Sequence, residues 1–250
     1  GSGIKIGQIE NSTTSSHAIN VRSIISAIAP DATIESRSVS TMQTFYSQVE
    51  SLISSGCTVI NMSANYYPEN GRTSWYANEE KWLDHIEGPH GISFVNSAGN
   101  DVTGSRLEIA SPGMAYNIIT VGAINDNNTT TTSDDTVQPY SCYVNNGSNG
   151  CAKPEIMAPD TLFNPTSENP YPNGTSYSAP VITGVIAQLM EYKPYLKGNS
   201  RLVKAILVAG CDRKINETLD PNSSITAIEG AGIIDAVTSF SIMTQNKYRS

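Results

Sequence analysis

Short apolar segments alternate with amphipathic helical segments along most of the chain, and this alternation limits the possible folds more than any other feature. The expected strands span residues 4–9, 32–36, 58–63, 92–96 and 118–123. The expected helices span about 17–29, 42–54, 73–86, 181–190, 200–208 and 233–240. Strands separated by helices pair in parallel through right-handed crossovers. The sequence therefore predicts an α/β fold, a three-layer, doubly wound, mostly parallel sheet with helices on both faces, in a single domain covering residues 1–250.

Charge and hydropathy exclude two classes of partner. The net charge is −8, and no basic cluster is present to neutralise phosphates, so we expect no nucleic-acid partner. No apolar run approaches the roughly 20 residues that a membrane-spanning helix needs, so we expect no membrane span.

The four cysteines suggest a compartment. Cys142 and Cys151 flank a flexible polar loop of a length that a disulfide can close. Their spacing does not suit a zinc site, and no histidine lies nearby in sequence. We therefore expect a Cys142–Cys151 disulfide and a secreted or cell-surface protein.

A candidate nucleophile lies where a glycine-containing loop gives way to an apolar helical run. Small residues such as Gly174, Ser178 and Ala179 lie near Ser176, and the run 181–190 that follows it has no charges. The free N–H groups of a helix N-terminus can stabilise negative charge beside such a serine. A purely structural N-cap is the other interpretation of the same pattern.

Polar residues at the predicted strand ends supply candidate partners for Ser176. Glu10, Ser63 and Asn100 each end or follow a strand, and His17 comes shortly after the first strand. The carboxyl ends of parallel strands collect the working residues of such sheets. A serine needs a base, normally a histidine, and that histidine needs a carboxylate to orient it.

Seven segments in chain order resemble the subtilisin-like serine proteases, or subtilases. Residues 174–180 resemble the nucleophile motif Gly-Thr-Ser-Met-Ala-x-Pro, and residues 97–100 resemble the Ala-Ala-Gly-Asn segment that supplies the oxyanion-hole asparagine. The remaining matches are residues 29–32, 59–63, 118–123, 153–159 and 230–236. Together they cover nearly the whole chain.

The resemblance implies a serine endopeptidase that acts through an acyl-enzyme. Ser176 would be the nucleophile, His17 the general base and Asn100 the oxyanion donor. Glu10 stands where the family has Asp, and its arm is one methylene longer. Of the family's His-Gly-Thr-His-Val, this chain keeps only the first His, His17, and the Val, Val21. The stretch from Glu10 to His17 is much shorter than in subtilases.

The resemblance also implies a polypeptide substrate, and a propeptide or protein inhibitor as a further partner. Extended peptide would pair with Ser63, Ala64 and Asn65, opposite an edge near residues 38–41. Ser97, Ala98 and Gly99 would line the first specificity pocket without a charge. The chemistry requires no cofactor, and a structural Ca²⁺ site stays open.

Two other functions remain alternatives. A catalytically impaired member of the same fold could act as a peptide- or partner-binding module. A nucleotide-binding α/β protein is disfavoured, because the Gly-x-Gly at Gly230 and Gly232 does not follow an early strand.

Overall fold

The computed structural model describes residues 1–64, 76–101, 108–127, 129–130, 132–144, 151–161, 173–213, 215 and 228–245. Its strands are β1 (Lys5–Glu10), β2 (Thr33–Ser38), β3 (Val59–Met62), β4 (Ser93–Ser97), β5 (Ile119–Asn125), β6 (Thr136–Val137), β7 (Ile156–Pro159), β8 (Cys211–Arg213) and β9 (Ile233–Ile234). Its α-helices are α1 (Ser16–Ile28), α2 (Met42–Ser54), α3 (Asn78–His90), α4 (Thr175–Tyr192), α5 (Ser200–Ala209) and α6 (Ala236–Thr244).

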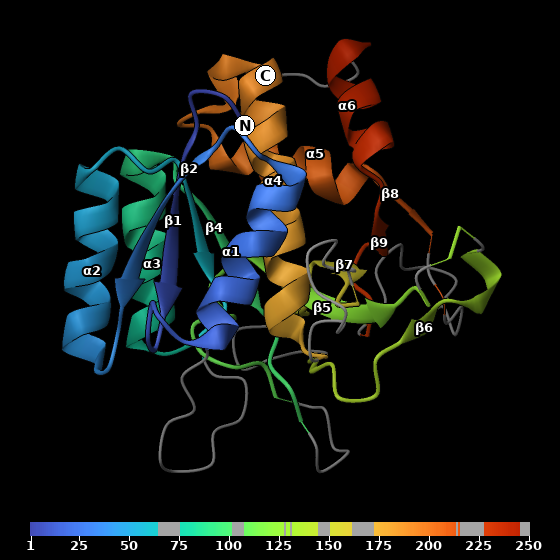
Figure 1. Cartoon of the computed structure of the whole chain (residues 1–250), viewed down its shortest axis with the longest axis horizontal. Helices are drawn as coiled ribbons and strands as arrows, with labels where there is room; N and C mark the ends of the chain where they lie inside the picture. The colour runs from blue at the N-terminus through green and yellow to red at the C-terminus, as the bar shows by residue number, and fades with distance from the viewer. Residues whose placement is uncertain are drawn as a thin grey trace.

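One sheet runs through the described part of the molecule (Figure 1). Its strand order is β2-β1-β3-β4-β5-β7-β9-β8, and β6 pairs with β5. The neighbours from β2 to β9 along this order are parallel, whereas β6 and β8 pair antiparallel with β5 and β9. The parallel strands bring their carboxyl ends to one edge, as the alternating sequence pattern predicts.

Alternate residues of the central strands feed the two largest hydrophobic cores, one on each face of the sheet. The larger core joins α1, α4, α5 and α6 to one face, and the other joins α2 and α3 to the opposite face. In β3, for example, Val59 belongs to the first core and Ile60 to the second. This division follows from the two-residue period of a strand, and it confirms the predicted three-layer, doubly wound fold.

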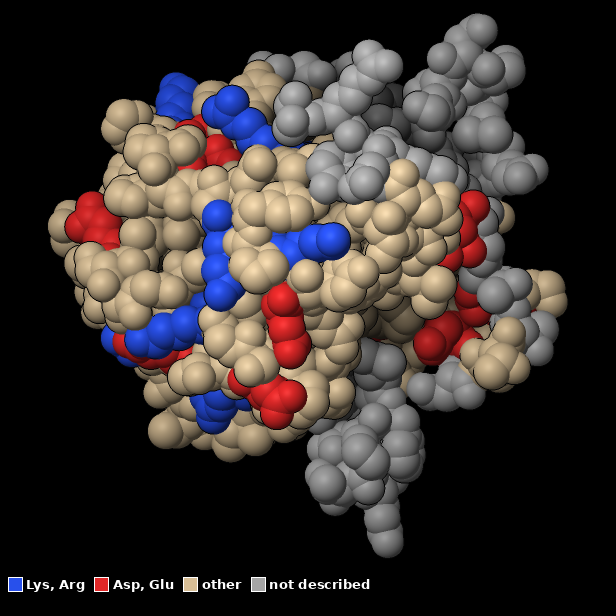
Figure 2. All heavy atoms as spheres, turned by 90° about the horizontal axis from the view of Figure 1, so that it is seen from above, with Lys and Arg blue, Asp and Glu red and all other residues tan. Residues whose placement is uncertain are grey.

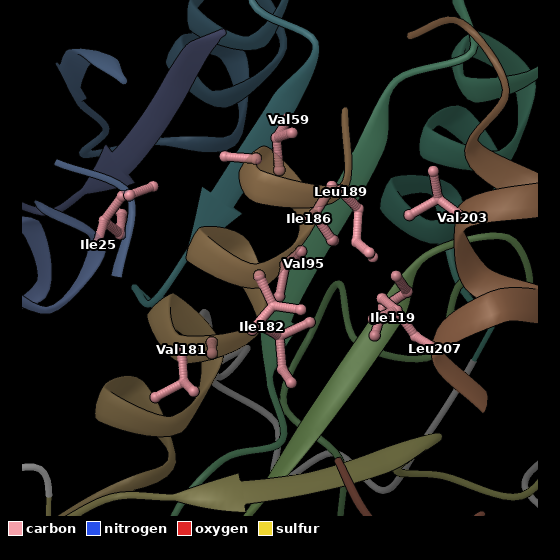
Figure 3. Packing of buried hydrophobic residues seen from close by; sticks show 14 of the residues in the cluster. Ile25, Val59, Val95, Ile119, Val181, Ile182, Ile186, Leu189, Val203 and Leu207 are labelled. Carbon is pink, nitrogen blue, oxygen red and sulfur yellow. The ribbon is translucent and has the colours of Figure 1, made fainter. Parts of the chain in front are cut away.

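Helix α4 lies across the middle strands and is buried almost all round. Figure 3 shows Ile182, Ile186 and Leu189 of α4 packed against Val59, Val95 and other strand residues. Helix α1 lies beside α4 on the same face (Figure 1). Because both helices begin at the carboxyl edge of the sheet, their first turns come together there.

Two helix predictions need correction. The helix expected over 73–86 begins at Asn78 and continues to His90, where Gly91 caps it in the left-handed conformation; residues 73–75 lie outside the described residues. The last helix was expected from residue 233, but Ile233–Ile234 pair as β9, and Asp235 caps α6 by accepting from the N–H groups of the next turn. Two isoleucines suit a short strand inside a sheet as well as a helix start, so periodicity alone does not separate the two.

The molecular surface carries charges of both signs. Seen from above, basic and acidic side chains are interspersed among uncharged ones (Figure 2). Within the described residues, no helix combines the length and apolar character that crossing a membrane requires.

Candidate functional site

The predicted catalytic side chains gather in one cleft at the carboxyl edge of the sheet. Glu10 ends β1 and Ser63 follows β3, while His17 and Ser176 are the second residues of α1 and α4. Together with Asn100, these four side chains line the same cleft. Segments separated by up to 166 residues in the chain therefore meet at one place, because the parallel sheet and the adjacent helices α1 and α4 converge there.

Glu10 and His17 are in direct contact. The Glu10 carboxylate is buried, and its Oε2 lies 3.0 Å from His17 Nδ1. Ser15 caps α1 by accepting from Ala18 N–H, and the His17 ring rests 5.4 Å from the ring of Tyr177. An ionised carboxylate only accepts hydrogen bonds, so Nδ1 is the nitrogen that carries the proton, and Nε2 of the neutral ring is the basic one.

Ser176 is held in a reciprocal pair of hydrogen bonds with Ser63. Ser176 Oγ donates to Ser63 O at 3.0 Å, and Ser63 Oγ donates to Ser176 O at 2.9 Å. Asn61 Nδ2 donates to Ser63 Oγ, and Thr183 Oγ1 donates to Asn61 Oδ1, each at 2.9 Å. Within the described residues, Ser176 Oγ makes no hydrogen bond to His17, so the hydroxyl must rotate away from Ser63 O before that contact can form.

Asn100 has a defined amide orientation. Its Oδ1 accepts from Thr175 N–H and from Thr175 Oγ1, each at 3.0 Å. Thr175 Oγ1 in turn accepts from Gly99 N–H at 3.1 Å. Because a backbone N–H can only donate, Oδ1 must face Thr175 and Nδ2 must point to the other side. A Cβ at Gly174 would stand 3.2 Å from Nδ2, so glycine keeps this approach open.

Gly174, two residues before Ser176, is held by Asp160, a residue that the sequence analysis did not identify. Asp160 is fully buried. Its Oδ2 accepts from Gly174 N–H at 2.9 Å and from the Tyr140 hydroxyl, and its Oδ1 accepts from Gln138 Nε2 at 2.8 Å. Burial raises the pKa of Asp160 above its usual value, and the three hydrogen bonds oppose that rise. The only sequence signal was an acidic residue directly after the apolar segment of β7.

The predicted substrate-contact residues divide into three groups. Ser63 and Ala64 line the cleft. Ser97, Ala98 and Gly99 are buried, and none is among the described residues that line it. Asn65 lies outside the described residues, so its contact with substrate stays a prediction.

The expected Cys142–Cys151 disulfide is absent, because both residues are thiols. The ends of their loop are joined instead by an antiparallel bridge between Val144 and Lys153. Continuing that register would pair Cys142 with Glu155, so the two cysteines are not opposite one another. Within the described ranges, no three His, Cys, Asp or Glu side chains come together as metal ligands would.

Comparison with known proteins gives one family match and several similar structures. The model described as "Subtilase family" matches residues 3–227. Serine protease AprX of Bacillus subtilis (strain 168) is 34% identical over 165 residues, which is 58% of this chain and 34% of that protein. The chain thus spans about a third of that relative's length.

The similar structures support the fold. The patellamide maturation protease PatA has a TM-score of 0.71 at 18% identity, with 98% of each chain covered. MycP1 with its N-terminal propeptide removed has a TM-score of 0.65 at 19% identity, covering 95% of this chain and 90% of that one. At these identities the likeness shows the fold alone.

Proposed function

The chain belongs to the subtilase family, a family of serine proteases, and on that premise we propose that it is a serine endopeptidase with a Ser176–His17–Glu10 triad. The observation that carries the proposal is the 3.0 Å contact between Glu10 Oε2 and His17 Nδ1 in the cleft that also holds Ser176 and Asn100. This contact is the geometry that a triad needs to orient its base.

In the proposed mechanism, Ser176 Oγ leaves Ser63 O and turns to His17 Nε2. His17 takes the hydroxyl proton as Oγ attacks the substrate carbonyl, and later gives that proton to the leaving amine. Glu10 stays ionised and stabilises the imidazolium through Nδ1–H. In the second half of the reaction, His17 takes a proton from water as the water attacks the acyl carbon, and gives that proton to Ser176 Oγ as the bond from Oγ to the acyl carbon breaks.

The oxyanion of the tetrahedral intermediate would receive two hydrogen bonds. One comes from Asn100 Nδ2, whose direction is set by the Thr175 contacts to Oδ1. The other comes from Ser176 N–H, one of the first four N–H groups of α4, which have no acceptor within the helix. Donors already held in place stabilise developing charge without reorganisation, and this is usually a large part of the rate enhancement.

An apolar pocket beside the cleft supports a preference for an apolar side chain in the polypeptide substrate. Ile9, Met42 and Phe45 line it, and it shares Ala64 with the cleft. Residues 39–41 also line it, and they belong to the stretch in which we expect the edge that faces the bound peptide. We expect an apolar side chain on the acyl side of the cut to enter this pocket. Peptide sets that differ only by leucine or glutamate at each such position test this, and equal cleavage would contradict it.

The partners follow from the same proposal. The substrate is a polypeptide, and a propeptide or protein inhibitor would occupy the same cleft. A secreted or cell-surface location stays a separate proposal, because the disulfide that suggested it is absent. The chemistry uses only side chains of this chain, so no cofactor takes part in the proposed steps.

A serine-reactive fluorophosphonate tests the activity directly. Wild type and Ser178→Ala should be labelled and should cleave peptide, whereas Ser176→Ala should do neither. Ser178 is a matched control, because its buried Oγ has no hydrogen-bond partner among the described residues and lies two residues further along α4. If wild type takes no label between about pH 6 and 9, the endopeptidase proposal fails, and a peptide- or partner-binding role takes its place.

A further inference from the structure

Gln8 is a buried polar side chain in an otherwise apolar part of β1. It is fully buried, and it lies two residues before Glu10 on the same face of the strand, since side chains of a strand alternate between faces. That face is covered by α1, which carries His17. A buried carboxamide is costly unless its donors and acceptor are all paired, so its partners indicate what holds it there.

All the hydrogen-bonding groups of Gln8 are used. Nε2 donates to Glu10 Oε1 at 3.1 Å and to the backbone oxygen of Ala18 at 2.9 Å. Oε1 accepts from Ser36 Oγ at 2.6 Å and from Arg22 Nη1 at 3.4 Å. Ser36 reaches Gln8 because the two residues are paired in the parallel register of β1 and β2.

These partners leave Gln8 only one amide orientation. Glu10 and the Ala18 carbonyl are acceptors, and the Arg22 guanidinium is a donor. Flipping the amide would put its NH2 group against Arg22 and its oxygen against the Glu10 carboxylate. The donor of Gln8 must therefore face Glu10.

The two oxygens of Glu10 consequently have separate tasks. Oε1 accepts from Gln8, and Oε2 contacts His17 Nδ1. The same Gln8 amide also binds the carbonyl of Ala18, the residue after His17 in the first turn of α1. One side chain thus fixes both the carboxylate and the helical turn that carries the histidine.

We propose that Gln8 is a positioning residue that sets the geometry of the Glu10–His17 pair. The inference rests on the proposed peptidase function of this site. A glutamate has one more rotatable bond than an aspartate, so its carboxylate needs a second contact to stay in line with the histidine. Gln8 supplies that contact from the same strand, and Arg22 and Ser36 keep Gln8 itself in place.

The kinetic test replaces the amide by an apolar side chain of similar size. Gln8→Leu should lower kcat by about 10- to 100-fold, as for other residues that orient a catalytic ligand or base, with little change in KM. The matched control is Gln188→Leu, because Gln188 Nε2 also donates to a backbone carbonyl of α1, that of Ile28 at the other end of the helix. The control should keep the wild-type kcat. An unchanged kcat in Gln8→Leu would overturn the inference.

A double variant separates positioning from a general structural effect. In a Glu10→Ala background, Gln8→Leu should have no further effect on kcat, because the group through which it acts is gone. An equal fold loss in both backgrounds would mean that Gln8 only supports the fold. If Gln8→Leu does not fold, Ser36→Ala, which removes one donor to Gln8 Oε1, makes the same test in a milder form, and an unchanged kcat there overturns the inference as well.

A spectroscopic readout keeps this inference distinct from the peptidase proposal. The Nδ1 proton of His17, held against Glu10, should give a downfield NMR resonance in wild type and Gln188→Leu, and should lose it in Gln8→Leu. A wild type that takes no fluorophosphonate refutes the peptidase but leaves this measurement valid. Persistence of the resonance in Gln8→Leu refutes the positioning role whatever the activity.

Discussion

The buried ionic cluster around Glu155 makes a strong prediction about stability. Lys153 is fully buried, and its Nζ donates to Glu155 Oε1 at 2.5 Å and to Ala115 O at 2.7 Å. Lys204 Nζ donates to the same carboxylate oxygen at 2.7 Å, and Glu155 Oε2 accepts from Thr120 N–H at 2.8 Å. The cluster therefore ties β7 to the start of β5 and to α5.

Glu155→Gln removes the only negative charge that these two ammonium groups contact in the described part of the chain. Breaking a buried pair by removing one partner costs about 3 to 5 kcal/mol, because the remaining charge is left uncompensated. For a chain of this size each kcal/mol lowers Tm by about 2 to 4 °C, so we expect a fall of about 6 to 20 °C. Glu50→Gln, at an exposed position of α2, should change the free energy of unfolding by less than about 0.5 kcal/mol.

The effect should depend on pH with a defined sign. Burial would raise the pKa of Glu155, but the charges of Lys153 and Lys204 outweigh burial and hold it below its usual value near 4.5. A carboxyl with a lowered pKa in the folded state adds stability that is present above the unfolded-state pKa and is lost as pH falls through the folded-state pKa. The difference between wild type and Glu155→Gln is therefore full at pH 7 and shrinks below about pH 4.5.

Thermal and urea unfolding at pH 7 and pH 4 measure these differences. Lys153→Met/Glu155→Gln should be more stable than the sum of the two single effects predicts, by about 0.5 to 3 kcal/mol, because it no longer buries an unpaired ammonium. A Glu155→Gln variant that melts within 2 °C of wild type, or strictly additive single effects, would refute the reasoning.

Two further predictions concern a glycine and the proposed acid. Gly91 and Gly56 both have positive φ, but a Cβ at Gly91 would lie 2.1 Å from Gly198 O, whereas nothing lies within 4 Å at Gly56. Gly56→Ala should cost about 1 to 2 kcal/mol of backbone strain, and Gly91→Ala about 1 to 3 kcal/mol more; equal denaturant midpoints would contradict this. Glu10→Asp draws the carboxylate away from both His17 and Gln8, and such a misplacement should lower kcat by up to about 100-fold. A kcat at or above that of wild type would remove Glu10 from the proposed triad.

The amino-acid sequence was sufficient to predict the fold class and to identify the candidate residues of the site. Strand and helix periods differ, so their alternation along the chain indicates parallel pairing before any contact is known. Ser176, His17 and Asn100 were found because they lie in short local segments or at strand ends. The replacement of the family's Asp by Glu10 was equally visible in the sequence. Whether the Glu10 carboxylate reaches His17 was not, because that depends on the side-chain rotamer and on the backbone.

The supporting residues could not be found in this way. Gln8 was hidden in an apolar strand, and Asp160 follows a short strand in a region without regular pattern. Most of their hydrogen-bond partners lie ten or more residues away along the chain. The prediction of a Cys142–Cys151 disulfide was wrong for a related reason. Loop length permits a bridge, but the register in which the two sides of the loop pair decides whether the thiols lie opposite one another.

Local patterns in the chain are thus enough for the sheet, the family resemblance and the candidate nucleophile, base and oxyanion donor, because each depends on neighbours within a few residues. Only three-dimensional packing determines that one carboxylate oxygen of Glu10 contacts Gln8 while the other contacts His17. The same holds for the hydrogen bond between Ser176 and Ser63, 113 residues earlier. These contacts depend on strand register and on the meeting of α1 and α4, which bring together groups that no local pattern relates.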